Sequence, residues 1–197
     1  MFPQDHIARH TVFLSLGSNL GNRMDNIESA RRILLQSVGQ LVVSSPVYES
    51  EPWGFKSDHW FLNQVVKMKT MLQPFPLMEK MLEIEEQIGR ERKEEGYTDR
   101  LIDLDILFYD DFVINGKVLT LPHPGVADRM FILKPLREIA PDMEHPLLKT
   151  SVKKLLKKCK DKGKVKKYTG KERLFSHMLA TIIAQITIPS SAKLKYL

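Results

Sequence analysis

A stretch typical of a β-strand, Leu101 to Tyr109, constrains this chain most, because two aspartates interrupt its apolar residues. Side chains alternate along a strand, so Asp103 and Asp105 are expected on one face, about 7 Å apart at their Cα atoms. Ile106 and Phe108 are expected together on the opposite face. Two carboxylates this close repel one another, so the pair is expected either to have a raised pKa or to bind a cation.

The residues around this pair favour magnesium and a polyphosphate. Mg²⁺ prefers oxygen ligands and is commonly held by one or two carboxylates together with substrate phosphates. Guanidinium groups bind phosphate oxygens through paired hydrogen bonds, and three arginines precede the strand: Arg90, Arg92 and Arg100. The Asp-x-Asp pattern is short, however. The alternative is that both aspartates lie on the exposed face of an edge strand, with the arginines as surface partners.

Apolar periodicity along the chain predicts the order strand, helix, strand, strand, helix, strand. The strands are expected at 11–16, 41–48, 60–71 and 101–109, and the helices after Asn22 and over 74–89. This order is that of a ferredoxin-like βαββαβ core, an α+β fold whose antiparallel sheet is covered on one face by helices. Additional C-terminal strands and helices are expected beyond it. We assign residues 1–160 to one domain and residues 161–197 to a lysine-rich extension.

Several residues within these elements carry their own expectations. Asn22 is expected to cap the first helix, and Pro46 indicates an edge position or a bulge in the second strand. Phe61 and Asn63 are expected on one face of the third strand. Asn63 either satisfies nearby backbone or binds a ligand. Trp53 lies in a proline and glycine loop, where it either covers the core or lines a pocket.

The charge of the chain is divided unevenly. Residues 151–197 carry 13 Lys and Arg against 2 Asp and Glu, a net charge of +11, whereas residues 1–150 carry 17 against 22, a net charge of −5. The acidic body argues against a ferredoxin-like RNA-binding module, which is the alternative from another class. A single cysteine, no apolar run long enough to span a bilayer and no signal-peptide pattern predict a cytoplasmic protein.

Seven motifs, taken together, resemble the 6-hydroxymethyl-7,8-dihydropterin pyrophosphokinase family. They are LGSNLGNR, YESEPWG, FLNQVV, GRERKEEGYTDR, DRLIDLDIL, LTLPHP and DRMFILKPLREIAP, and they follow the family's order and spacing over about residues 11–141. The resemblance implies a ferredoxin-like α+β fold and the transfer of pyrophosphate from ATP to a pterin alcohol in folate biosynthesis. It also implies a Mg²⁺-dependent enzyme with two ions, small-molecule substrates, no nucleic acid or membrane partner, and a monomer or weak dimer.

The resemblance also implies roles for individual residues. Both metal ions would be held by Asp103 and Asp105. The catalytic set would be Arg90, Arg92, Arg100, Asp103 and Asp105, with the 89–100 loop closing over the site. The ATP site would comprise Glu85, Arg92, Tyr97, Arg100, Ile106, Thr120, His123 and Arg129. The pterin would lie between the rings of Phe61 and Phe131, within a site formed by Ser50, Trp53, Phe61, Asn63, Tyr97 and Phe131.

Three positions depart from the family pattern. Asp99 stands where many members carry Pro, which is expected to alter loop closure, and Gly125 stands where a bulkier residue is common, which predicts a looser loop. Phe61 cannot donate the hydroxyl that a Tyr would. The tail after the domain is expected to be a solvated extension, with self-association or contact with anionic lipid as the alternative. Truncation at Lys160 is therefore expected to leave catalysis intact.

Overall fold

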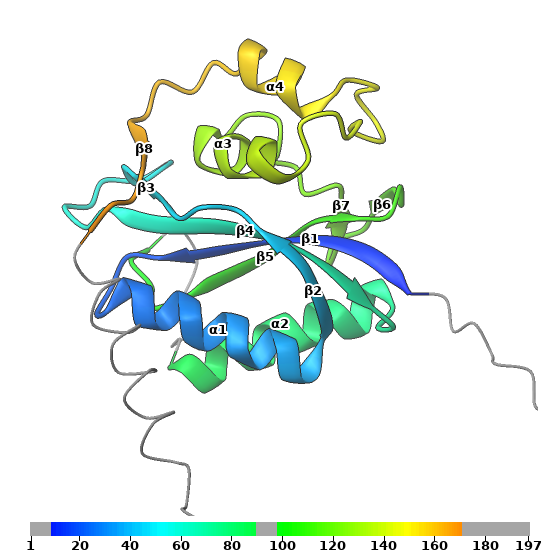
Figure 1. Ribbon diagram of the computed structural model, residues 1–197, viewed down its shortest axis with the longest axis horizontal. Coiled ribbons are helices and arrows are strands. Elements are labelled where there is room, and N and C mark those ends of the chain that lie inside the picture. The colour runs from blue at the N-terminus through cyan, green and yellow to red at the C-terminus, as the bar shows by residue number, and fades with distance from the viewer. Residues whose placement is uncertain (1–8, 90–97, 171–197) are drawn as a thin grey trace, which may run out of the picture.

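The computed structural model describes residues 9–89 and 98–170 (Figure 1). The first part of the chain forms β1 (His10–Ser18), α1 (Arg23–Ser37), β2 (Gly39–Ser44), β3 (Tyr48–Ser50), β4 (Phe61–Thr70), α2 (Pro74–Ile88) and β5 (Asp103–Tyr109). The second part forms β6 (Ile114–Asn115), β7 (Thr120–Leu121), α3 (Met130–Ile139), α4 (Val152–Lys158) and β8 (Val165–Lys167). The predicted strand and helix order is thus present.

The main sheet has six strands and is antiparallel at each of its pairings. Its order is β5-β1-β4-β3-β8, and β2 pairs with β4 beside β3. The stretch predicted as one strand at 41–48 is divided into β2 and β3, and Pro46 lies in the break between them. Proline lacks the backbone N–H that a ladder requires, which explains the interruption. The ferredoxin-like α+β arrangement is confirmed.

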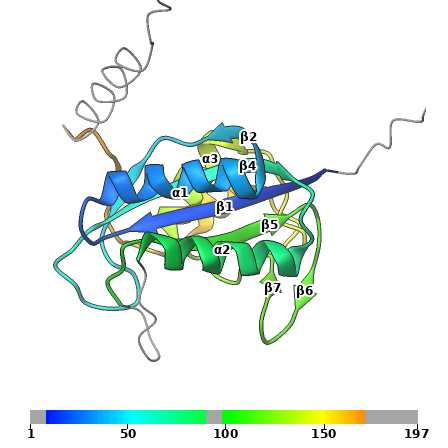
Figure 2. The same cartoon turned by 90° about the horizontal axis from the view of Figure 1, so that it is seen from below.

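Helices lie on both faces of the sheet, whereas the sequence predicted them on one. Helices α1 and α2 lie side by side on the first face, as Figure 2 shows from below. Helix α3, with α4 beyond it, lies on the opposite face (Figure 1). Two separate apolar clusters reflect these layers, one under α1 and α2 and one under α3 and α4.

A β-bulge corrects the predicted faces of β5. The register between β1 and β5 shifts between Phe13 and Leu14, where Leu14 pairs with Ile106 but Phe13 pairs with Phe108. The extra residue, Leu107, and Phe108 both pack in the α3 cluster, whereas Ile106 remains in the α1 and α2 cluster. The prediction that Phe108 shares a face with Ile106 is therefore wrong, because a bulge interrupts the alternation of side chains.

Local sequence explains where α1 begins and where α2 ends. Asn22 caps α1, and its side-chain oxygen accepts a hydrogen bond from the backbone N–H of Asp25 at 3.3 Å. Gly89 ends α2 in the left-handed conformation, with a φ of 101°, which glycine adopts without steric cost.

The segment after α4 returns to the main sheet. Strand β8 pairs with β3, so that Lys167 lies opposite Tyr48 and Val165 lies opposite Ser50. This strand lies beyond residue 160, in the segment that the sequence assigned to the extension, and its pairing joins it to the fold. Within residues 9–89 and 98–170, no helix is long and apolar enough to cross a membrane.

Candidate active site

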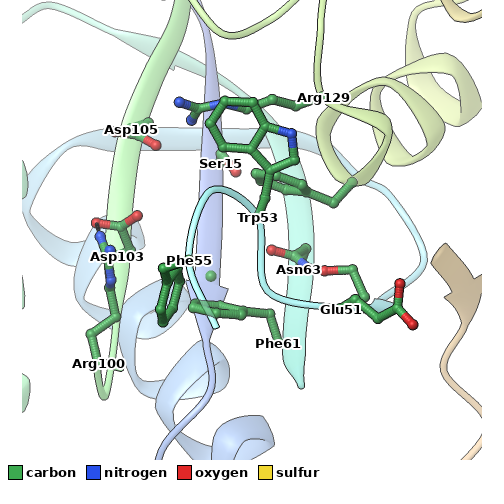
Figure 3. Close-up of a pocket in the computed structure, with 13 residues that line it drawn as sticks. Ser15, Glu51, Trp53, Phe55, Phe61, Asn63, Arg100, Asp103, Asp105 and Arg129 are labelled. Carbon is green, nitrogen blue, oxygen red and sulfur yellow. Dashed lines mark hydrogen bonds and ion pairs between the residues drawn. The ribbon is translucent and has the colours of Figure 1, made fainter. Parts of the chain in front are cut away.

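A pocket opens on the face of the sheet that carries α3 (Figure 3). Strands β1, β4 and β5 form its floor, and the loop after β3 and the start of α3 border it. The structure gathers there many of the residues predicted for the site: Ser50, Trp53, Phe61, Asn63, Arg100, Asp103, Asp105, Arg129 and Phe131. Arg90, Arg92 and Tyr97 lie outside the described residues.

Asp103 and Asp105 both open into this pocket from β5, so the prediction that they share a face is confirmed (Figure 3). They pair with Gly17 and Ser15 of the neighbouring strand β1. The guanidinium of Arg100 lies against the first carboxylate, with Nη1 2.8 Å from Asp103 Oδ1. One of the two negative charges is thus compensated by a cation from the same short stretch of chain.

The second carboxylate is held in a less favourable environment. Its recessed position, and then the negative charge of Asp103, raise the pKa of Asp105 to about 7, although Arg129 and Arg100 oppose the shift. A bound cation would offset both effects, because it would stabilise the ionised form of Asp105. No group of three or more His, Cys, Asp or Glu side chains within the described residues could hold a metal. An ion here would therefore need ligands from water and substrate, as Mg²⁺ commonly does.

Asp99 takes part in a polar cluster that fixes the chain just before the carboxylates. Asn19 Nδ2 donates to Asp99 Oδ1 at 2.6 Å, and His59 Nδ1 lies 3.0 Å from Asp99 Oδ2. The Asn19 side-chain oxygen accepts a hydrogen bond from the backbone N–H of Arg100 at 2.7 Å. Asp99, which stands where many family members carry Pro, thus links three segments through these hydrogen bonds. They are the turn after β1, the loop before β4 and the segment leading to β5.

The aromatic part of the pocket is built from three separate segments. Phe61 and Asn63 come from β4, and Phe131 comes from the first turn of α3. Asn63 Nδ2 donates to the hydroxyl of buried Ser50 at 3.0 Å, which fixes the orientation of the amide. Phe55 packs edge-on against Phe61, with ring centroids 6.2 Å apart. Two aromatic rings and an oriented amide suit a flat ligand with a hydrogen-bonding edge.

Arg129 extends from the start of α3 past the ring of Trp53 toward Asp105 (Figure 3). Its guanidinium carbon is 4.3 Å from the ring centroid of Trp53 and 5.9 Å from that of Phe131. A Cβ atom at Gly125 would lie only 2.4 Å from Arg129 Nε. The glycine that was expected to loosen its loop therefore provides the space that the arginine side chain fills.

Four of the residues predicted for the ATP site do not line the pocket: Glu85, Ile106, Thr120 and His123. Glu85 is buried on α2, where Oε1 accepts a hydrogen bond from the backbone N–H of Leu104 at 2.7 Å. Ile106 is buried in the cluster under α1 and α2. Thr120 lies on β7 and donates its hydroxyl to the backbone oxygen of Gly116 at 3.1 Å. Glu85, Ile106 and Thr120 thus each make a contact that supports the fold.

His123 lies beside the carboxylates instead. Its Nε2 is 3.8 Å from Asp105 Oδ1, and its Nδ1 accepts a hydrogen bond from the backbone N–H of Gly125 at 3.0 Å. Burial, and then the positive charge of Arg129, lower the pKa of His123 to about 4. The imidazole is therefore neutral near pH 7, with its proton on the nitrogen that faces Asp105.

Sequence reasoning missed four residues of the pocket: Ser15, Gly17, Glu51 and Phe55. The first two alternate on β1 with the buried Leu14 and Leu16, so a polar residue in an apolar strand was an available signal. Glu51 and Phe55 lie in the irregular loop after β3, where no periodicity indicates which side chains point inward.

The chain is similar in sequence to a known enzyme family. Residues 13–141 match the family model for 7,8-dihydro-6-hydroxymethylpterin-pyrophosphokinase (HPPK). Over 138 residues the chain is 43% identical to the 2-amino-4-hydroxy-6-hydroxymethyldihydropteridine pyrophosphokinase of Porphyromonas gingivalis, which covers 68% of this chain and 93% of that protein. The protein of the same name from Aquifex aeolicus is 41% identical over 143 residues, which covers 73% and 88% of the two chains.

A solved structure shows the same fold. The wild-type HPPK-DHPS of Plasmodium falciparum superimposes with a TM-score of 0.65 at 18% sequence identity, over 77% of this chain. The chain spans 45% of that solved chain, so the likeness concerns one part of a longer protein.

Proposed function

The chain belongs to the 7,8-dihydro-6-hydroxymethylpterin-pyrophosphokinase family, and from this premise we propose that Asp103 and Asp105 hold Mg²⁺ and ATP beside an aromatic pterin site. The family's reaction is pyrophosphoryl transfer to hydroxymethyldihydropterin in folate biosynthesis, with ATP as co-substrate. The observation that carries the residue assignment is that the two carboxylates and the aromatic walls open into one pocket (Figure 3).

We propose two Mg²⁺ ions, with Asp103 and Asp105 as their protein ligands. The crowding that raises the pKa of Asp105 supports this assignment, because a cation would stabilise both carboxylates in the ionised form. Bound Mg²⁺ would supply charge neutralisation and a template for the triphosphate. Arg100, now paired with Asp103, would then be available to neutralise phosphate charge.

The pterin would lie between Phe61 and Phe131, with Asn63 reading its polar edge. The hydrogen bond from Asn63 to Ser50 supports this role, since it orients the amide before any ligand binds. The Ser50 and Trp53 backbone would complete the edge contacts. Phe61 contributes only its ring, because it has no hydroxyl.

The reaction would begin with attack by the pterin hydroxyl oxygen on the β-phosphorus of ATP. The bond from that phosphorus to the oxygen shared with the α-phosphate breaks, AMP leaves and the hydroxyl proton is released. Arg129 lines the pocket beside Trp53 and would balance charge on the transferred group, with neutral His123 near it. We propose that positioning and charge neutralisation carry the rate, without a general base.

The remaining assignments rest on the family resemblance. Glu85, Ile106 and Thr120 would support the nucleotide site through the backbone that they hold, and Arg90, Arg92 and Tyr97 would contribute from residues 90–97. We propose small-molecule substrates only, without nucleic acid, and a monomer or weak dimer.

Product analysis tests the proposal directly. Incubation with ATP, Mg²⁺ and the pterin alcohol should yield AMP and the pterin diphosphate in equal amounts, and EDTA should abolish both. ADP as the nucleotide product would indicate ordinary phosphoryl transfer and contradict the proposal. Undiminished AMP formation in EDTA would contradict the metal requirement alone.

A further inference from the structure

The C-terminal segment from Asp161 to Tyr168 holds one wall of the aromatic site by backbone pairing. Strand β8 within it lies along β3, with Val165 opposite Ser50. The contact continues into the pocket loop, because Glu51 donates its backbone N–H to the oxygen of Lys164 at 3.1 Å. The backbone N–H of Lys164 in turn donates to Glu51 Oε2 at 2.9 Å. The loop after β3 is thus fixed by the segment from its first residue.

The same segment holds the opposite wall. Asp161 Oδ2 accepts a hydrogen bond from the backbone N–H of Met130 at 2.9 Å. Met130 is the first residue of α3 and lies between Arg129 and Phe131 in the chain. Asp161 Oδ1 accepts a second bond, from Gly163 N–H at 2.8 Å, which fixes the carboxylate. One carboxylate therefore caps the helix end that carries the second aromatic ring.

The two walls also contact each other directly. At the end of α3 that carries Phe131, the guanidinium carbon of Arg129 lies 4.3 Å from the ring centroid of Trp53. A hydrogen bond joins the walls farther along the helix. Tyr48 on β3 donates its hydroxyl to Glu138 Oε1 at 2.7 Å, near the C-terminal end of α3. Lys134 Nζ also donates to the backbone oxygen of Val165 at 2.5 Å. The end of α3 that carries Phe131 depends on Asp161 for its capping contact.

We propose that residues 161–168 form a strap that sets the separation of the two pterin-site walls, with Asp161 as its main positioning residue. The inference rests on the proposed pterin site. A flat ring between two aromatic faces needs a separation of roughly 7 Å, twice a van der Waals contact of about 3.5 Å, and a gap of about 0.5–1 Å forfeits a quarter to a half of the contact energy. The expectation that truncation at Lys160 leaves catalysis intact does not fit these contacts.

The test compares two full-length variants of equal charge change. Asp161→Ala removes the contact to Met130, and Asp142→Ala removes an exposed carboxylate that pairs with Lys153 away from the pocket. If the strap sets the separation of the walls, Asp161→Ala should raise KM for the pterin about tenfold and leave KM for ATP within about twofold of wild type. Asp142→Ala should leave both KM values unchanged. Equal pterin KM values in the two variants, or equal rises in both KM values, would overturn the strap.

A second pair of variants acts on the backbone and remains informative if Asp161→Ala does not fold. The bonds from Glu51 to Lys164 and from Tyr168 to Val47 place Glu49 and Lys166 as the hydrogen-bonded pair between them. Lys166→Pro removes that ladder donor, and Lys166→Ala keeps it.

Only the proline variant should raise the pterin KM, whereas similar pterin KM values in Lys166→Pro and Lys166→Ala would overturn the inference. A wild-type enzyme that forms no AMP would instead contradict the proposed function. Each result therefore bears on one of the two proposals.

Discussion

The two halves of the pocket are built in different ways. The carboxylate half takes Arg100, Asp103 and Asp105 from six consecutive residues, and one strand holds both acids in place. The aromatic half takes its side chains from β4, the loop after β3 and the start of α3, with β8 behind them. The first half depends on local geometry and concentrated charge. The second depends on the tertiary placement of separate segments.

This difference predicts different kinetic failures. Loss of a charge in the carboxylate half should act on the chemical step, where phosphate charge is redistributed. Loss of a contact in the aromatic half should act mainly on binding of one substrate. Variants in the two halves therefore test whether the division holds.

The largest effect is expected in the carboxylate half. Asp103→Ala and Asp105→Ala should each lower kcat about 1,000-fold or more, because each removes a proposed ligand of the metal that organises the phosphates. Rates of AMP formation at saturating substrates measure this effect. Asp111→Ala, in the exposed turn after β5, serves as the control and should keep its rate. A kcat within tenfold of wild type in either site variant contradicts the metal assignment.

An intermediate effect is expected at Asn63. Asn63→Ala removes the amide that is buried against Ser50 and proposed to read the pterin edge. Loss of a buried hydrogen-bonding partner costs about 2 kcal/mol, which corresponds to about a 30-fold rise in pterin KM. The KM for ATP should change little. A comparable rise in both KM values would show that the two halves are not independent.

The carboxylate half could be predicted from sequence because its geometry follows from one strand. Alternation alone places Asp103 and Asp105 on a common face. The same reasoning failed five residues after the first of them, at Phe108, because the bulge at Leu107 reverses the faces beyond it. The bulge depends on how β1 pairs with β5, and the sequence of β5 alone does not predict its position.

The aromatic half needed information that periodicity does not contain. Phe61 and Asn63 could be placed on one face of β4, but which wall opposes them depends on where α3 packs. Asp161 illustrates the limit, since the lysine-rich composition around it suggested a solvated extension. Its contact with Met130 joins residues 31 positions apart, and only the folded arrangement reveals it.

A smaller effect is expected where the two halves meet. Trp53→Leu removes the ring that lies 4.3 Å from the Arg129 guanidinium. A cation–π contact of about 1 kcal/mol corresponds to about a fivefold loss in kcat/KM, and we expect it in the ATP parameter. Phe55→Leu is the matched control, because Phe55 packs on Phe61 and should alter only the pterin parameter. An unchanged ATP parameter in Trp53→Leu would place Arg129 outside the phosphate site.

The smallest effect concerns stability. It distinguishes the effect of the Asp105 charge on the free energy of unfolding from the proposed role of this residue in turnover. The folded protein raises the pKa of Asp105 to about 7, above its unfolded value of about 3.9. The folded state therefore binds more protons between these values, and the contribution of this group to stability falls as pH rises from about 4 to 7. Asp105→Asn removes that penalty.

In EDTA at pH 8, Asp105→Asn should therefore raise the melting temperature although it abolishes turnover. The side chain is 33% exposed, so solvent screening reduces the gain to about 1 kcal/mol, or about 2–4 °C for a chain of this size. The gain should shrink toward pH 4, where the wild-type carboxylate is protonated in the folded state and about half protonated in the unfolded state. Saturating Mg²⁺ and ATP should reverse the order, because the wild type alone gains binding free energy. A gain that is equal at pH 4 and pH 8 would show that packing, rather than charge, distinguishes the two side chains.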